Sequence, residues 1–116
     1  MKDKTVYLEV VLESLGLIKK YTKGHDLHGF LEDRKTQDAV IRNIEVIGKA
    51  LKDYGIELLV VKNPDIPWQK IASMRNILAH EYLGVDLSLI WGTLNKDLDV
   101  LKGVLDQIVE KSDKEN

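Results

Sequence analysis

The apolar residues of this chain recur at helical spacing over most of its length, and this period constrains the fold more than any other feature. The last third has the clearest stripe, at Trp91, Leu94, Leu98, Leu101, Leu105 and Ile108. A second stripe runs through the middle of the chain, at Val40, Ile44, Ile47, Leu51 and Tyr54. Steps of three and four place such side chains along one face of an α-helix, so both segments are predicted to be core-facing helices.

Glycine, proline and aspartate mark where the helices end and begin. Gly24 is expected to end a first helix, and Gly55 ends the helix in the middle of the chain. Pro67 suits the first turn of the next helix, because its missing N–H is not needed there. Asp86 precedes the final stripe and is expected to cap that helix.

Residues 56–62, IELLVVK, are the ambiguous segment. They are β-prone, but no second strand is visible to pair with them, so they indicate an extended linker or a helix extension. The predicted fold is all-α, a bundle of four longer helices and one short helix. We expect a single domain over residues 1–116, with a disordered polar tail at 111–116. The apolar surface exceeds what four helices alone would bury, which favours a homodimer.

The composition is that of a soluble globular protein, with 44% hydrophobic and 31% charged residues. Cysteine is absent, which excludes disulfides and thiolate metal sites. Acidic residues interrupt the apolar N-terminal stretch, and no run is long enough to span a membrane, so we expect a cytoplasmic protein. The net charge of −2 gives no global attraction for nucleic acid. DNA is not expected as a partner, and RNA would need a local basic patch.

A polar cluster interrupts the apolar pattern in the string MRNILAHEYLGVD. On a regular helix Asn76 and His80 lie about 40° apart and Arg75 and Tyr82 about 20° apart, but Arg75 and His80 are separated by about 140°. One helix therefore cannot direct all of them at one point. Either the helix ends near His80, with Gly84 nearby to release it, or a second subunit completes the site.

The cluster has two interpretations. It is either the end of a core helix, with His80 favoured by the helix dipole and Arg75 in a surface ion pair, or it is chemical machinery. A histidine with a pKa of about 6.5 can exchange protons with a ribose 2′-hydroxyl or a leaving oxygen. An arginine can hold the phosphate, Asn76 can orient either group, and the Tyr82 hydroxyl can contact substrate or be modified. The string R-x4-H-x-Y alone is too common to decide.

Other kinds of site have little support in the sequence. His25 and His28 could share a metal, but no acidic or histidine cluster joins them, so solvated histidines are favoured. No phosphate-binding glycine loop or serine nucleophile motif occurs. We therefore expect no metal and no cofactor.

Three blocks of the chain resemble the HepT-like HEPN proteins, the toxin half of HepT/MntA toxin–antitoxin modules. They are DRKTQDAVIRNIEVIGKA, PDIPWQKIASMRNILAHEYLGVD and DLSLIWGTLNKDLDVLK, and their order and spacing agree from about Val6 to Leu105. This resemblance implies an HEPN-type bundle and a metal-independent endoribonuclease. The enzyme would act as a two-fold homodimer on RNA, either mRNA or tRNA. Lys49 stands where relatives commonly have an acidic residue.

The family signature R-x4-H-x-Y falls on Arg75, His80 and Tyr82, with Asn76 as the polar residue after the arginine. The resemblance implies that Arg75 and His80 are catalytic. It also implies that Tyr82 is AMPylated by a cognate MntA-type nucleotidyltransferase antitoxin. ATP would then be used by that partner and not by this chain.

The predicted middle helix contains three polar residues with two possible interpretations, Arg42, Asn43 and Glu45. They form a solvated face, or Arg42 and Asn43 line the cleft while Glu45 pairs with Arg75 or His80. A competing hypothesis for the whole chain is a non-catalytic helical adaptor that docks a minimal nucleotidyltransferase. A weaker third option is a nucleotide-binding bundle.

Overall fold

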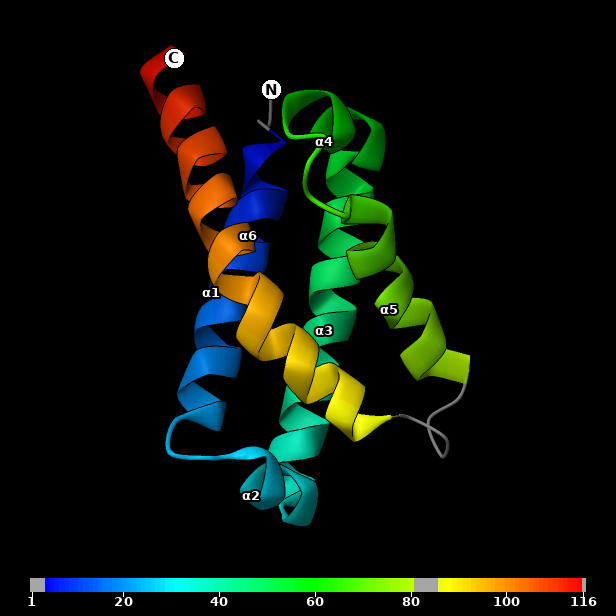
Figure 1. Cartoon of the computed structure of the whole chain (residues 1–116). Helices are drawn as coiled ribbons and strands as arrows, with labels where there is room; N and C mark the ends of the chain where they lie inside the picture. The colour runs from blue at the N-terminus through cyan, green and yellow to red at the C-terminus, as the bar shows by residue number, and fades with distance from the viewer. Residues whose placement is uncertain (1–3, 81–85, 116) are drawn as a thin grey trace.

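The chain folds into six α-helices, and the described residues contain no strand, which confirms the all-α prediction. This computed structural model describes the backbone of residues 4–80 and 86–115 and the side chains of residues 4–74 and 86–112. In chain order the helices are α1 (Thr5–Thr22), α2 (Leu27–Glu32), α3 (Arg34–Tyr54), α4 (Ile56–Lys62), α5 (Trp68–His80) and α6 (Leu87–Glu115) (Figure 1).

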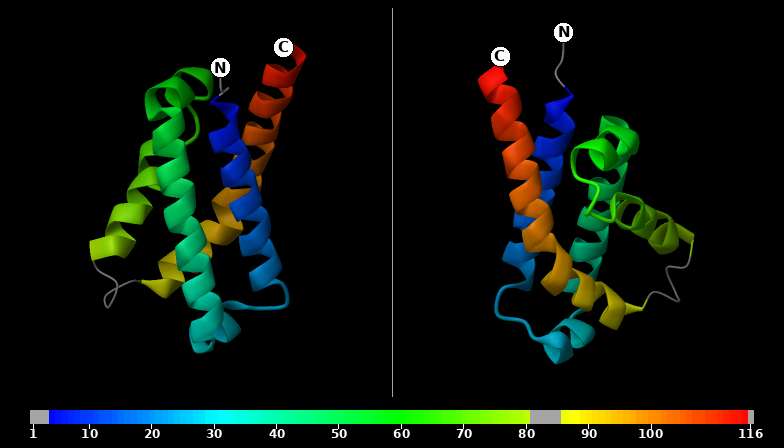
Figure 2. Two further views of the ribbon diagram at one scale, coloured as in Figure 1. Left: turned by 180° about the vertical axis from the view of Figure 1, so that it is seen from behind. Right: turned by 45° about the horizontal axis from the view of Figure 1, so that its top comes forward.

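The long helices α1 and α3 form an antiparallel pair at the centre of the bundle (Figures 1 and 2). α6 packs along α1, and α5 packs against α3. α2 lies at one end of this pair, while α4 lies at the other end, close to the start of α1 and the end of α6 (Figure 1). None of the helices in the described part of the chain is long and apolar enough to cross a membrane.

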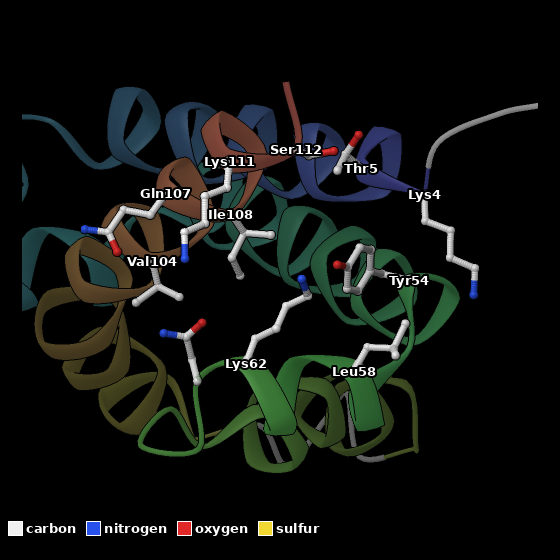
Figure 3. Close-up of a pocket in the computed structure, with 11 residues that line it drawn as sticks. Lys4, Thr5, Tyr54, Leu58, Lys62, Val104, Gln107, Ile108, Lys111 and Ser112 are labelled. Carbon is white, nitrogen blue, oxygen red and sulfur yellow. The ribbon is translucent and has the colours of Figure 1, made fainter. Parts of the chain in front are cut away.

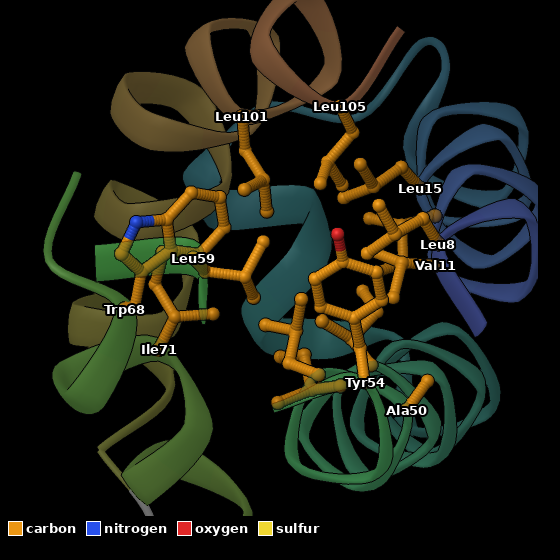
Figure 4. Close-up of a cluster of buried hydrophobic side chains, with 14 of the residues drawn as sticks. Leu8, Val11, Leu15, Ala50, Tyr54, Leu59, Trp68, Ile71, Leu101 and Leu105 are labelled. Carbon is orange, nitrogen blue, oxygen red and sulfur yellow. The ribbon is translucent and has the colours of Figure 1, made fainter. Parts of the chain in front are cut away.

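The core follows the two predicted stripes. All five stripe residues of α3 are buried, together with residues from α1, α4, α5 and α6 that include Leu8, Val11, Leu59, Trp68, Leu101 and Leu105 (Figure 4). Truncating a fully buried Leu of this kind to Ala costs about 2–5 kcal/mol. On α6 the stripe is buried at Leu101, Leu105 and Ile108 but only partly buried at Trp91, Leu94 and Leu98.

The predicted helix boundaries agree with the structure. Gly24 and Gly55 both have positive φ, at 81° and 118°, a conformation that side chains disfavour. The Asp86 carboxylate accepts a hydrogen bond from the Leu89 backbone N–H at 3.1 Å, as expected of an N-cap.

Residues 56–62 form helix α4. The turn at Gly55 directs the chain away from α3, so these residues cannot extend that helix. The backbone N–H groups of Leu58 and Leu59 both donate to the Gly55 carbonyl, and Leu59 is fully buried. Burial of Leu59 favours a helical turn here, although the β-branched Ile56, Val60 and Val61 prefer an extended conformation.

The polar tail is helical rather than disordered at residues 111–115, because α6 continues to Glu115. The segment VEKSDKE contains no Gly or Pro to stop the helix, and Lys102 and Asp106 form an i,i+4 ion pair at 2.8 Å one turn earlier.

His25 is partly buried and paired, so the expectation of a solvated histidine is wrong for this residue. Its Nε2 lies 3.0 Å from the Asp33 Oδ2, and its side chain is 24% exposed. Asp33 also caps α3 by accepting from the Thr36 N–H and hydroxyl. The hydrogen bond with His25, followed by those from Thr36, lowers the pKa of Asp33 to about 2. The same bond to Asp33 raises the pKa of His25 above 6.5.

We expect this pair to make stability depend on pH in two windows. The Asp33 contribution is present above its ordinary pKa of 3.8 and is lost as the pH falls toward 2. The His25 contribution is complete below 6.5 and is lost as the pH rises through the raised pKa. Thermal unfolding should therefore show a larger fall in Tm between pH 6 and pH 8.5 for the wild type than for His25→Gln. His28→Gln, which changes a histidine that is 81% exposed, is the matched control. Equal falls in the wild type and His25→Gln would contradict the assignment.

Candidate active site

Helix α5 includes Arg75, Asn76 and His80 of the polar cluster, and its first turns are firmly held. Trp68 is 1% exposed, and its indole N–H donates to the Asn63 carbonyl at 2.9 Å. One turn later Ile71 is buried against the core, and its N–H donates to the Pro67 carbonyl. A buried indole with its N–H satisfied fixes both the position and the rotation of the helix.

The other end of α5 diverges from α3 and lies at the side of the bundle (Figures 1 and 2). The backbones of Arg75, Asn76 and His80 belong to this last part of α5. Their side chains lie outside the described residues, and Tyr82 and Gly84 lie outside the described backbone. The roles assigned to these residues therefore stay predictions.

The described backbone shows that one copy of α5 cannot direct both Arg75 and His80 at one point. α5 is helical through His80, so Arg75 and His80 keep their helical separation of about 140°. Arg75 follows Ile71 by four residues and shares its face, whereas His80 follows Ile71 by nine residues and lies about 180° away. A single copy of α5 does not bring both positions to one point.

The start of α6 provides a second fixed anchor beyond the cluster. Ile90 is 4% exposed, and its N–H donates to the Asp86 carbonyl. The rings of Trp91 and Phe30 lie 5.1 Å apart, which ties α6 to α2. In the sequence, the signature thus lies between two anchored segments, the first turns of α5 and the start of α6.

A small cavity of about 20 Å³ lies between α3, α5 and α6. It is lined by Ile44, Ile47, Ile71, Met74, Thr93, Leu94, Asp97 and Leu98. Asp97 is the one charged side chain among these lining residues, and it shares the cavity with Met74, the neighbour of Arg75 in the chain. Sequence reasoning did not single out Asp97. The only feature of the sequence that could have indicated Asp97 is that it directly precedes Leu98, a residue of the last apolar stripe.

The three predicted supporting residues on α3 do not share one environment. Arg42 and Glu45 line a surface hollow of about 320 Å³ between α1 and α3, beside the Lys49–Asp53 ion pair. No described residue of α5 lines that hollow. Asn43 is 9% exposed, and its amide donates to the Ala39 carbonyl of its own helix at 2.9 Å. The pairing of Glu45 with Arg75 or His80 concerns side chains outside the described residues and stays a prediction.

The described residues contain no group of three or more His, Asp or Glu side chains arranged to hold a metal ion. His25 pairs with Asp33, and the His28 Nε2 lies 3.4 Å from the Glu32 Oε1 at the exposed surface. The two histidines that the sequence raised as metal ligands therefore each have a carboxylate partner of their own.

Comparison with known proteins places the whole signature within a recognised family. The family described as "Ribonuclease HepT-like" matches residues 11–108, a span that includes Arg75, His80 and Tyr82. A protein of Thermococcus cleftensis named "Probable ribonuclease HepT" is 40% identical over 88% of this chain and 92% of its own length. A "Putative RNase" of Caldanaerobacter subterraneus is 34% identical over 96% of this chain and 98% of its own length.

A relative from Methanocaldococcus jannaschii, named "Gamma-glutamylcyclotransferase and putative RNase", is 44% identical over 97% of this chain. The chain spans 50% of that relative's length. No solved structure matches the chain. The family match covers all six helices in whole or in part, and two of the relatives are matched over more than nine-tenths of their length. The chain therefore belongs to the ribonuclease HepT-like family.

Proposed function

We propose that this protein is a metal-independent endoribonuclease whose catalytic residues are Arg75 and His80. The observation that carries the proposal is the family match over residues 11–108, which includes the complete R-x4-H-x-Y signature. The structure supports it by placing the end of α5 at the side of the bundle, where an RNA chain can approach (Figure 1).

The chemistry needs only the two side chains. His80 takes the proton from a ribose 2′-hydroxyl and then delivers it to the leaving 5′ oxygen. The 2′ oxygen attacks phosphorus as the bond to the 5′ oxygen breaks, leaving a 2′,3′-cyclic phosphate and a free 5′-hydroxyl. Arg75 holds two phosphate oxygens and stabilises their charge as it develops.

The proposed active form is a two-fold homodimer, in which Arg75 of one protomer faces His80 of its partner. The separation of about 140° along one helical α5 supports this arrangement, because symmetry brings two copies of the signature to one cleft. The start of α6 also retains apolar surface for a partner. Leu89 is 64% exposed, and Trp91, Leu94 and Leu98 are only partly buried.

We expect Arg75→Ala and His80→Ala each to lower RNA cleavage by a factor of at least about 100, as loss of a general acid–base or phosphate-binding group does. Cleavage is measured with purified protein in EDTA. Matched controls are Lys70→Ala, an exposed cation on α5, and His28→Ala, an exposed histidine on α2. Circular dichroism confirms that each variant is folded.

Cleavage at the wild-type rate by either active-site variant would contradict this mechanism. A wild-type protein that cuts no RNA at any concentration, yet forms a stable complex with a nucleotidyltransferase, would favour the adaptor hypothesis instead.

The shared cleft predicts that the two inactive variants complement each other. In an equal mixture half of the dimers contain one Arg75→Ala and one His80→Ala protomer, and each keeps one intact Arg75–His80 pair. About a quarter of the wild-type activity should return after subunits exchange. Mixing His80→Ala with the Arg75→Ala/His80→Ala double variant should restore nothing. No recovery in the first mixture, with exchange verified by native mass spectrometry, would place both residues of a working site in one protomer.

We further propose that the protein is the toxin of a toxin–antitoxin module, silenced by AMPylation of Tyr82. Tyr82 lies two residues after His80, so a nucleotide attached there would bring negative charge to the position that the RNA phosphate must occupy. Electrostatic repulsion and bulk would both oppose substrate binding.

Intact mass spectrometry after incubation with the cognate MntA-type nucleotidyltransferase and ATP tests this regulation. The wild type should gain mass in whole AMP units, and Tyr82→Phe should gain none. Tyr21→Phe, which removes an exposed hydroxyl from α1, should be modified like the wild type. Modification of Tyr82→Phe to the wild-type extent would show that the target is another residue.

A further inference from the structure

A large hollow lies where α4 meets the start of α1 and the end of α6. We refer to it as the lysine pocket (Figure 3). Its volume is about 480 Å³, and it is lined by Lys4, Thr5, Tyr54, Leu58, Lys62, Asn63, Val104, Gln107, Ile108, Lys111 and Ser112. A volume of this size is typical of small-molecule sites.

The charge of the lysine pocket is of one sign. Lys4, Lys62 and Lys111 come from three parts of the chain, and none of the described residues that line the pocket is a carboxylate. None of these three lysines has an ion-pair partner within the described residues. In contrast, Lys49 and Lys102 each pair with an aspartate four residues along their own helix. The described lining of the pocket thus has three positive charges, although the whole chain has a net charge of −2.

The polar and apolar side chains of the lysine pocket lie in different parts of it. In Figure 3 the ammonium groups of Lys62 and Lys111 and the hydroxyl of Tyr54 point into the space between α4 and α6, while the Lys4 ammonium lies at the outer rim. Val104 and Ile108 of α6 provide an apolar wall beside them. Tyr54 is 6% exposed, so its ring is held by the core and its hydroxyl position is fixed.

We propose that the lysine pocket binds the phosphate of a nucleotide. Lys62 and Lys111 hold the phosphate oxygens as strongly charged, three-donor groups, and the Tyr54 hydroxyl and the Gln107 amide add polar contacts. The apolar wall at Val104 and Ile108 accommodates the ribose or base. The same phosphate chemistry is offered by a free mononucleotide and by an RNA chain. The proposal does not rest on the ribonuclease activity, because none of the described residues that line the pocket belongs to α5.

The test is a titration of the ¹⁵N-labelled full chain followed by NMR. The probes are AMP, and a short RNA made uncleavable by 2′-O-methyl groups. Backbone signals of Asn63, Gln107 and Ile108 should shift with at least one probe. Lys62→Gln/Lys111→Gln should weaken this binding about tenfold or more, as expected for the loss of two charge-assisted contacts. Lys62→Arg/Lys111→Arg should retain it, which guards against a purely structural effect.

The matched control is Lys52→Gln/Lys96→Gln, which removes the same charge from exposed positions outside the pocket and should change binding less than about twofold. Shifts with AMP identify a free nucleotide as a ligand, and shifts with RNA alone identify the RNA backbone. The proposal is overturned if neither probe moves these signals, or if the pocket and control variants weaken binding equally. Because binding is read at the pocket itself, a failure of RNA cleavage leaves the result interpretable.

Discussion

The apolar face of α3 is the surface on which the rest of the molecule is assembled. Its stripe from Val40 to Tyr54 is buried throughout, and α1 and α5 pack against different sides of the same helix. At about 2–5 kcal/mol for each large side chain lost, a few truncations along this stripe would consume the 5–15 kcal/mol stability of an ordinary domain. The position of α5 therefore depends on α3, although α3 contributes no residue of R-x4-H-x-Y.

Helix α5 is well packed against the core at its first turns and diverges from α3 at its other end. Trp68 and Ile71 fix its first turns in the core, and the helix then leaves α3 before it reaches His80. A helix held at one end can present its last turn to a ligand or a partner without disturbing the core. The partly buried start of the α6 stripe lies on the next helix of the chain, so apolar surface remains uncovered on the helix that follows the proposed catalytic turn.

Much of the fold was predictable from spacing, because long amphipathic helices record their buried face in the sequence. The stripes of α3 and α6 and the breaks at Gly24 and Gly55 needed no tertiary information. α4 was ambiguous because its β-branched residues and its single buried Leu59 favour different conformations. The R-x4-H-x-Y pattern is visible in the sequence, but helix geometry alone left its meaning open.

The features that sequence reasoning missed all join residues that lie apart in the chain. Nothing in the sequence near His25 indicates that it bonds the carboxylate that caps α3. Likewise, Asn43 is buried and its neighbour Arg42 is exposed because of how the helices pack. The lysine pocket brings together positions 4, 62 and 111, so its charge is invisible to any local window. Net charge is equally uninformative, because −2 is a sum over the whole chain, whereas the described lining of the lysine pocket has three lysines and no carboxylate. For any ligand that carries a phosphate, the local field at each hollow decides where that phosphate binds, because screening confines surface charges to about 10 Å.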